Sequence, residues 1–492
     1  MTYVIGIDFG SQSIKGVLID PDGQIRSSGS HPLTMSHPRG GWAEQDPSHW
    51  EEGIAIVIAK VLGNAGVAGS EIGMLCLACQ VDGVVPISRE GEALGPAIIW
   101  LDRRADVQAD ELARSVGPKR LFEITGLQPD SSHSGPKVMW LRDHEPEMFA
   151  TAFAFPPAAG YLLYHLTGQL AIDHANASSS LLYDLKLRQW SDELLDAAGL
   201  SASQLGRIGE ASEVAGTLSS GAAERIGLST SCQVLIGTGD EHAGSIGAGA
   251  VSTGIITDVT GTAEPVTVAT DSFVLDYDGL VETHAHALPG FYLLENPGFV
   301  SGGSTLWLAQ NVLKVSQAEL FDLAALAPAG SNGVLFLPAL SGAMTPRWNA
   351  QMRGAFAGLD MSHTASDMAR AVLEGCTYAL RDITDRFLSL GLGGDEIRIV
   401  GGGSISDLWL QIKADVTGRP VRPVLTHHAT AVGAALLAGV AAEIFSDLDD
   451  AVNRTVTLGD EPYVADPKRA NLYDDAYGRY QALFEGVEKV LA

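Results

Sequence analysis

The sequence predicts an α/β protein with two domains. Short β-rich runs alternate with amphipathic helical segments along the 492 residues, which is the pattern of domains built on a central sheet. With 46% hydrophobic residues, a chain of this length can bury more than one core. A glycine-rich segment over 235–261 replaces the helix formers, so we expect a boundary near Gly244 and domains over 1–244 and 245–492.

The charge balance favours a small-molecule partner. The chain carries 31 Lys+Arg against 59 Asp+Glu, a formal net charge of −28, which leaves no basic face for a nucleic acid or an anionic membrane. The longest apolar run, 431–442, is shorter than the roughly 20 residues of a membrane span, and no cationic leader is found at the N-terminus. Four cysteines are too few for a disulfide framework. We therefore expect a cytoplasmic protein. The sequence leaves its oligomeric state undecided, with a homodimer as one candidate.

The first domain is expected to begin with a strand meander over 4–7, 15–19 and the segment after the turn at 21–23. A helix should follow, with Asp46 as its N-cap, Pro47 at its first position and Gly63 near its end. Cys76 and Cys79 have CxxC spacing. They lie in an apolar run typical of a buried strand, with no further ligand pair, so we interpret them as structural thiols rather than a zinc or redox site.

The second domain contains three expected elements. Residues 255–270 repeat the plan of the N-terminal hairpin: an apolar strand, an acidic residue, a glycine turn and a second strand. Residues 367–388 have one apolar helical face, and Thr364 with Asp367 three positions later forms a variant capping box. Residues 397–416 predict a strand, three glycines and a helix.

The N-terminal hairpin carries a candidate phosphate site. A glycine turn directs backbone N–H groups into one concavity, to which Gly10, Ser11 and Ser13 contribute donors and Lys15 a positive charge. Asp8 would be an odd acceptor among donors unless Mg²⁺ lies between it and the phosphates. A plain β-hairpin with a polar turn remains the alternative at this point.

Two further glycine sites fit the same chemistry. Gly261 and Thr262, in the second hairpin, would hold phosphates from the opposite domain. The glycines 401–403 would let a flat ring or a phosphate approach the backbone at the start of a helix, although an ordinary strand-to-helix turn is the alternative.

Asp240, in the glycine-rich segment GDEHAG, is the candidate general base. A carboxylate between two phosphate-binding hairpins is placed where a hydroxyl nucleophile needs a proton acceptor. Glu241 and His242 compete for this role. We interpret the pairs His284/His286 and His427/His428 as ordinary loop histidines, because no acidic cluster accompanies them at a helical offset.

The ordered set of segments resembles the FGGY family of carbohydrate kinases, which shares a superfamily with hexokinase, actin and Hsp70. The segments that carry the resemblance are GIDFGSQSIKG (6–16), GWAEQDP (41–47), GDEHAG (239–244), DVTGTAEP (258–265), GAFAGLDMSHTASDMARAVLE (354–374) and GGGSISD (401–407). The resemblance implies two RNase H-like (actin-like ATPase) domains that close over ATP, Mg²⁺ and a sugar in an interdomain cleft. It also implies that Asp240 is the base, that Asp8 positions the metal, and that Gly402, Gly403 and Ser404 belong to the adenosine site.

The resemblance is closest to xylulose kinases, with one departure at the sugar site. Where xylulose kinases carry a Met-His pair in GQMHG, this chain has CQVDG, and the implied sugar contacts are Gln80, Val81, Asp82, Trp100, Asp102 and Asp240. A carboxylate at 82 accepts hydroxyl hydrogen bonds where an imidazole has mixed chemistry. The expected substrate is a ketopentose such as D-xylulose, or a related ketose or alditol; erythritol, ribulose and glycerol are alternatives, although the Arg-Glu pair of glycerol kinases is absent.

Two hypotheses from other classes remain at this stage. An actin- or Hsp70-like switch would hydrolyse ATP slowly and bind a protein partner, and a sugar-binding regulator would not turn over at all. GDEHAG and the segment 354–374 favour the kinase over the switch. The retention of Asp8, Asp240 and Gly261 disfavours the inactive regulator.

Overall fold

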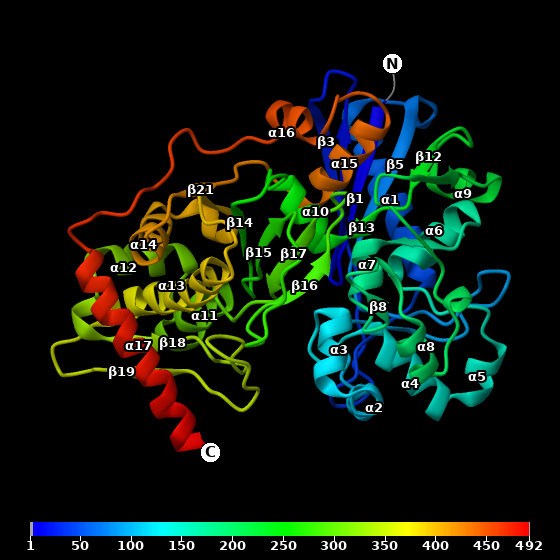
Figure 1. The fold of residues 1–492 in the computed structure, drawn as a ribbon. Helices are drawn as coiled ribbons and strands as arrows, with labels where there is room; N and C mark the ends of the chain where they lie inside the picture. The colour runs from blue at the N-terminus through cyan, green and yellow to red at the C-terminus, as the bar shows by residue number, and fades with distance from the viewer. Residues whose placement is uncertain (1–2, 492) are drawn as a thin grey trace.

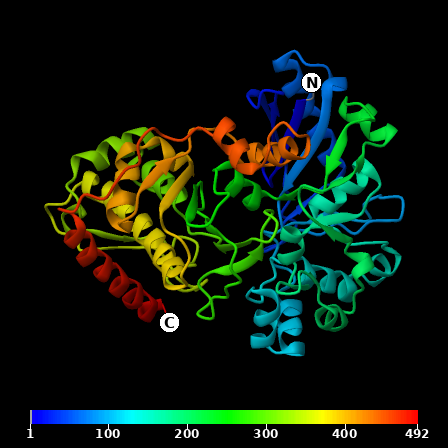
Figure 2. The same cartoon turned by 45° about the horizontal axis from the view of Figure 1, so that its top comes forward.

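A computed structural model describes residues 3–491 as two lobes side by side, each with its own central sheet (Figures 1 and 2). The first sheet has the order β11-β12-β5-β1-β2-β3, with β13 beside β5. Its strands are β1 (Tyr3–Phe9), β2 (Ser13–Ile19), β3 (Ile25–Pro32), β5 (Ile72–Cys79), β11 (Val214–Thr217), β12 (Gln233–Leu235) and β13 (Thr238–Gly239). The expected strand meander is thus β1-β2-β3, paired antiparallel throughout.

The second sheet repeats this arrangement in part, with the order β16-β17-β15-β14-β20-β21. Its strands are β14 (Ile255–Thr260), β15 (Val266–Thr270), β16 (Glu282–Ala285), β17 (Tyr292–Asn296), β20 (Glu396–Gly401) and β21 (Val421–Pro423). The predicted second hairpin is β14-β15, and β14 pairs in parallel with β20 just as β1 pairs in parallel with β5. The expected α/β architecture of two related lobes is confirmed.

Helices cover the sheets and fill the space around them. The longer ones are α1 (Ser48–Ala65), α2 (Asp106–Val116), α4 (Ser134–His144), α6 (Ala158–Thr167), α12 (Gln317–Leu326), α13 (Ala365–Ser389), α14 (Asp407–Thr417), α15 (Ala429–Ala441) and α17 (Ala470–Leu491). The shorter ones are α3 (Pro118–Thr125), α5 (Pro146–Thr151), α7 (His174–Ser178), α8 (Asp192–Ala198), α9 (Ser220–Ile226), α10 (Asp240–Gly247), α11 (Gly302–Leu306) and α16 (Leu448–Thr455). Short strand pairs β4-β6 (Glu44–Gln45, Ala97–Ile98), β7-β10 (Ala171–Asp173, Arg207–Gly209), β8-β9 (Tyr183–Asp184, Gln189–Trp190) and β18-β19 (Leu335–Leu337, Ala355–Ala357) complete the fold. Within residues 3–491, none of the helices has the length and hydropathy that a bilayer crossing requires.

The two predicted helix starts are close to those observed. Helix α1 begins one residue later than expected, with Pro47 as N-cap, and the Asp46 carboxylate accepts a hydrogen bond of 2.9 Å from the Ser48 N–H. It also extends past Gly63 to end at a left-handed Gly66. Helix α13 has the predicted capping box. The Thr364 hydroxyl accepts a hydrogen bond from the backbone N–H of Asp367, and the Asp367 carboxylate accepts one from the backbone N–H of Thr364.

Helix α15 links the two halves of the chain, because it follows the second sheet in sequence yet packs on the first. A Cβ at Gly6 of β1 would lie 2.2 Å from the Ala431 carbonyl oxygen, so the helix can approach the strand this closely only over a glycine. Helices α10 and α15 cross in the same way, since a Cβ at Gly433 would lie 1.9 Å from the Ala243 carbonyl oxygen. Gly244, the predicted boundary, is therefore inside α10, at the junction of the lobes.

The four cysteines are buried free thiols, as the sequence predicts. Cys76 and Cys79 lie in β5, and burial raises the pKa of both thiols far above the usual value. Raised pKa values keep the thiols protonated, so neither is suited to redox or metal chemistry.

Candidate active site

The two predicted catalytic carboxylates lie at one edge of the first sheet. Strands β1 and β13 both pair in parallel with β5, with Asp8 opposite Ala78 and Gly239 opposite Cys79. Asp240 follows Gly239 directly as the first residue of α10. Because the carboxyl ends of parallel strands meet at the same edge, Asp8 and Asp240 lie close together, and the charge of Asp8 helps to raise the pKa of Asp240.

Both carboxyl groups have raised pKa values. Burial raises the pKa of Asp240 well above its usual range, and the charges of Glu241 and Asp8 raise it further. Burial also raises the pKa of Asp8, while the Lys15 ammonium, 3.0 Å from its Oδ2 atom, acts in the opposite direction. A carboxylate with a raised pKa is a better proton acceptor than an ordinary aspartate, which suits the role predicted for Asp240.

The first hairpin turn is tied to the predicted sugar loop by a glutamine. The Gly10 N–H closes the turn on the Ser13 carbonyl oxygen at 3.2 Å. The Gln45 Nε2 atom donates to the Ser11 carbonyl oxygen at 2.6 Å, and the Gln80 Nε2 atom donates to Gln45 Oε1 at 2.8 Å. Gln45 lies in the GWAEQDP segment, so that segment connects the predicted phosphate turn to the predicted substrate loop, a role that the sequence did not reveal.

In the second lobe, the other hairpin and the three glycines lie together. Thr260 is opposite Gly401 in the parallel pair β14-β20. The Gly302 N–H at the start of α11 donates to the Gly261 carbonyl oxygen at 3.1 Å, and the Gly303 N–H donates to the Thr262 carbonyl oxygen at 3.0 Å. The Gly261–Thr262 turn is thereby held while its outer side stays exposed.

The glycine turn over 401–404 is packed on the end of β14. Gly403 is buried, and a Cβ there would lie 2.6 Å from the Thr260 side chain. Gly402 is exposed, and its Cβ would have its nearest neighbour at 3.7 Å. The Ser404 hydroxyl donates to the Gly401 carbonyl oxygen at 2.7 Å, so it stabilises the turn. This exposed backbone beside the Gly261–Thr262 turn fits a nucleotide.

We expect Gly403→Ala to destabilise the second lobe. The added methyl group would force the Thr260 side chain away from Asp258 and Lys413, to which it is hydrogen-bonded at 2.9 and 2.7 Å. Overpacking of this kind costs about 1–3 kcal/mol of the free energy of unfolding. Urea denaturation followed by circular dichroism measures the loss, and Gly402→Ala is the matched control with a much smaller effect. Equal losses in the two variants would contradict this packing.

Beneath these turns lies a buried ion cluster that the sequence did not indicate. The Lys413 ammonium in α14, fully buried, lies 2.5 Å from Asp258 Oδ2 and 2.9 Å from Glu264 Oε1. Burial and the charge of Asp258 raise the pKa of Glu264 to about 8, and the two acids raise that of Lys413. Lys413 thus joins α14 to both ends of the second hairpin. The position of Lys413 on an apolar helix gave no signal of buried acidic partners that lie 155 and 149 positions earlier in the chain.

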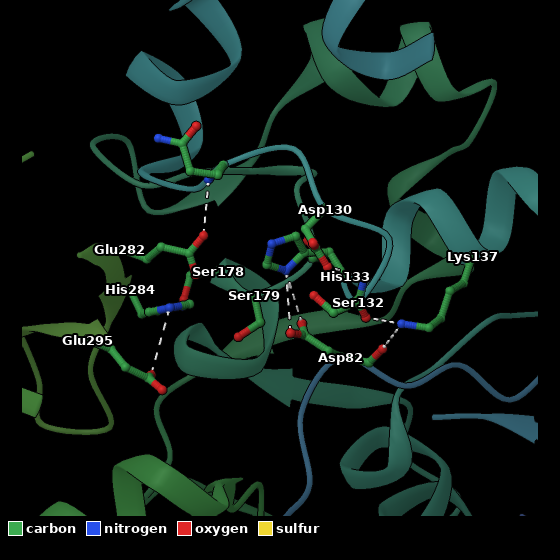
Figure 3. A network of polar contacts seen from close by, with 12 residues as sticks. Asp82, Asp130, Ser132, His133, Lys137, Ser178, Ser179, Glu282, His284 and Glu295 are labelled. Carbon is green, nitrogen blue, oxygen red and sulfur yellow. Dashed lines mark hydrogen bonds and ion pairs between the residues drawn. The ribbon is translucent and has the colours of Figure 1, made fainter. Parts of the chain in front are cut away.

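The predicted sugar loop follows β5. Gln80 is buried with its Oε1 atom unpartnered among the described residues, Val81 is half-buried, and Asp82 has a left-handed φ of 62°. The Asp82 carboxylate lies 3.4 Å from His133 Nδ1, and the Lys137 ammonium donates to the Asp82 carbonyl oxygen at 2.9 Å (Figure 3). Neither partner was predicted from the sequence.

The second lobe contributes to the same space through β16. Figure 3 shows Glu282 and His284 of this edge strand facing His133 and the serines at the end of α7. Burial raises the pKa of Glu282 to about 7 and lowers that of His284 to about 4. The interpretation of His284 as a loop histidine is wrong, because His284 lies in β16. His286 follows the strand in a loop, as predicted, and both side chains are buried.

Two of the predicted sugar contacts, Trp100 and Asp102, lie in the turn after β6. Asp102 is fully buried, and its oxygens accept hydrogen bonds from the Ala43 N–H at 2.6 Å and from the Arg104 side chain at 2.8 and 2.7 Å. These hydrogen bonds hold the Arg104 guanidinium against Trp42, 3.6 Å from the ring centre, and a sugar contact by Asp102 stays a prediction. Trp100 is 39% exposed in the turn that precedes Asp102, so it is not a core residue.

Comparison with known proteins identifies the family. The model of the FGGY carbohydrate kinase N-terminal domain matches residues 3–247, and that of the C-terminal domain matches residues 253–442. The chain belongs to the FGGY family of carbohydrate kinases. It is accordingly a sugar-phosphorylating enzyme, which decides between the kinase and the nucleotide switch. Members of this family use ATP, typically with Mg²⁺.

Relatives of this FGGY kinase act on several substrates. A xylulose kinase of Staphylococcus epidermidis is 29% identical over 99% of this chain and 98% of its own length, and a glycerol kinase of Thermococcus kodakarensis is 30% identical over 90% and 89%. Two solved structures from Lactobacillus acidophilus, a ligand-bound xylulose kinase and a gluconate kinase, each superpose with a TM-score of 0.92 over 99% of this chain and 99% of theirs, at 25% and 26% identity. These comparisons give a kinase for a sugar or polyol and leave the substrate to be derived from the site.

Proposed function

We propose that this FGGY kinase transfers the terminal phosphoryl group of ATP to a hydroxyl of a ketopentose such as D-xylulose, or of a related ketose or alditol. The observation that carries the proposal is the pair Asp8 and Asp240 at one sheet edge, with the pKa of Asp240 raised well above the usual range. A proton acceptor of raised pKa beside a candidate phosphate turn is what transfer to an alcohol requires.

The residues present fit ATP and Mg²⁺. Asp8 is a buried carboxylate beside the first turn, and the Gly261–Thr262 and Gly402–Gly403 backbones offer the second lobe's surface to the nucleotide. Among residues 3–491 no three His, Cys, Asp or Glu side chains are grouped as a metal cage, so Asp8 would share the ion with phosphates, as Mg²⁺ sites commonly do. When bound, Mg²⁺ neutralises charge on the phosphates.

Each of the chain's own groups then has a defined task. Asp240 accepts the proton of the attacking hydroxyl, and its raised pKa lets it hold that proton through the transfer. Lys15 holds the Asp8 carboxylate at 3.0 Å and presents positive charge at the turn. Closure of the lobes around α10 and α15 would exclude water, so that the alcohol rather than water is phosphorylated.

Support for a ketopentose comes from the relatives and from the loop after β5. Xylulose kinases are among both the curated relatives and the solved neighbours. Gln80 Oε1 and the Asp82 carboxylate offer acceptors to substrate hydroxyls. The test is kcat/KM for a panel of ketopentoses, pentitols, erythritol, glycerol and gluconate. We expect the highest value for a ketopentose, and a clear preference for glycerol or gluconate would overturn the assignment.

The pH profile should report the charge of Glu241. A base must be deprotonated, so kcat/KM falls as the pH drops through the pKa of Asp240, and the raised pKa places this fall above the range of an ordinary aspartate. Glu241→Gln removes one of the charges that raise the pKa, so we expect the midpoint of the acid limb to move to lower pH. Initial rates between pH 4 and roughly 9 measure it. An unchanged or higher midpoint would argue that Asp240 is not the titrating base.

A further inference from the structure

The Asp82 loop and the start of α4 form one rigid polar unit. Lys137, fully buried, donates from Nζ to the carbonyl oxygens of Asp82 and Ser132, which fixes the two backbone segments to each other. The Nδ1 atom of His133 lies 3.4 Å from both carboxylate oxygens of Asp82. As Figure 3 shows, the carboxylate and the imidazole are held side by side by buried contacts.

The His133 imidazole has a donor that the protein does not use. Burial opposes its charge, but the charge of Asp82 raises the pKa of His133 to about 9, so both ring nitrogens carry hydrogen at neutral pH. Nδ1 faces Asp82, whereas Nε2 is buried and has no hydrogen-bond partner among the described residues. His133 is 3% exposed, and a buried cationic donor without an acceptor is costly. An oxygen from a ligand would remove that cost.

Asp82 keeps acceptor capacity beside this donor. Its two oxygens share the single Nδ1–H of His133, and its side chain is 13% exposed. A carboxylate has about four acceptor sites, so hydroxyl protons can still be accepted. The carbonyl end of an open-chain ketose has the complementary pattern: the carbonyl oxygen only accepts, and the neighbouring hydroxyl can donate.

The second lobe adds negative charge around His133. The Thr283 N–H donates to the Gly126 carbonyl oxygen at 3.1 Å, which seats β16 on the first lobe. Glu282 Oε1 accepts a hydrogen bond from the Gln128 N–H at 3.2 Å. The charge of Glu282, like those of Asp82 and Asp130, raises the pKa of His133. Three acidic groups around one imidazolium oppose a substrate that carries a carboxylate.

The geometry points to His133 as a specificity-determining residue that donates from Nε2 to the carbonyl oxygen of a ketose while Asp82 accepts from the adjacent hydroxyl. The inference rests on the proposed phosphorylation of a sugar. Among ligands of the same chain length, we therefore expect the ketose to bind more tightly than the alditol, and the alditol more tightly than the aldonate. An alditol hydroxyl accepts a hydrogen bond from an imidazolium less well than a carbonyl oxygen does. An aldonate carboxylate brings its own negative charge close to the carboxylates of Asp82 and Glu282.

The first test is equilibrium binding by calorimetry to the full chain without nucleotide. The ligands are D-xylulose, xylitol and xylonate, and the variants are wild type and His133→Phe, which keeps the ring and removes both nitrogens. We expect wild type to bind the ketose at least tenfold more tightly than the alditol, and the aldonate more weakly than either. His133→Phe should lose tenfold or more for the ketose and only a few-fold for the alditol. His165→Phe is the control, because His165 is also paired with an acid, Glu51 at 2.9 Å, within the first lobe.

The second test needs only the wild-type protein. As the pH rises through about 9, the pKa of His133, the Nε2 atom changes from donor to acceptor, so ketose affinity should fall several-fold while xylitol affinity does not. The charged and titratable groups facing His133 are Asp82, Asp130, Glu282 and His284, with Lys137 behind the loop. Glu282 and Lys137 titrate near pH 7, with pKa values of about 7, and His284 near 4, so their effects separate from the change at 9.

The outcomes separate this inference from the proposed function. Equal binding of ketose and alditol by wild type, or equal losses for both ligands in His133→Phe, would overturn the role of His133 and leave sugar phosphorylation intact. Should His133→Phe fail to fold, the wild-type pH series alone decides, and parallel pH curves for the two ligands would count against the inference. If the wild-type protein phosphorylated none of the sugars and polyols in the panel, the proposed function itself would be refuted.

Discussion

Asp240→Asn is expected to lower kcat by about 10²–10⁴-fold, the usual contribution of a general base. The amide keeps the shape of the side chain but cannot accept the proton of the attacking hydroxyl. The affinity for ATP should stay within a few-fold, because the base acts in the transition state and not in nucleotide binding. Single-turnover rates and a direct titration of ATP measure the two quantities separately.

Glu241→Gln is the matched control for this variant. Glu241 is next to Asp240, is also an acid with a raised pKa, and was a competing candidate for the base. If Asp240 is the base, Glu241→Gln keeps most of its turnover at its own pH optimum. A near-normal rate in Asp240→Asn, or an equal collapse in Glu241→Gln, would move the role to another group.

Lys413→Met should cost about 3–5 kcal/mol of the free energy of unfolding, the effect of removing one partner from a buried ion pair. The ammonium is fully buried and is within 2.9 Å of both Asp258 and Glu264, so its loss leaves two buried acids without a cation. Because the cluster anchors the second hairpin, weaker ATP binding should accompany the lower stability. Chemical denaturation and nucleotide titration are the two measurements.

Two further variants make the stability prediction specific. Lys119→Met removes a lysine that is 82% exposed and 3.7 Å from Glu123, and it should cost well under about 1 kcal/mol. Combining Lys413→Met with Asp258→Asn should cost less than the sum of the single changes, because the second change removes a charge that the first left unpaired. Additive losses would show that the buried charges do not interact as described.

Local sequence patterns were enough to predict the elements that carry local chemistry. The hairpins β1-β2 and β14-β15, the capping box of α13 and the glycine turn before α14 each depend on residues within a few positions of one another. Their order along the chain then identified the family. Asp8 and Asp240 were also chosen from local pattern, since Asp8 comes directly at the end of a predicted strand and Asp240 lies in the glycine-rich segment.

The features that could not be predicted from the sequence depend on contacts between distant segments. His133 meets Asp82 from 51 positions away, and Lys413 meets Asp258 from 155 positions away, so no spacing rule connects them. The hydrogen bond that Asp102 accepts from the Ala43 N–H joins residues 59 positions apart, so local spacing could not predict it. His284 resembled a loop residue because β16 is short and stands at the edge of its sheet.

The most direct measurement is mass spectrometry of the products after incubation of the wild-type chain with ATP, Mg²⁺ and a ketopentose, with Asp240→Asn in parallel. We predict one sugar monophosphate for each ADP formed, and almost none of either product from the variant. ADP accompanied by free phosphate without a sugar ester, at a rate unaffected by Asp240→Asn, would contradict phosphoryl transfer from ATP to a sugar hydroxyl through this aspartate.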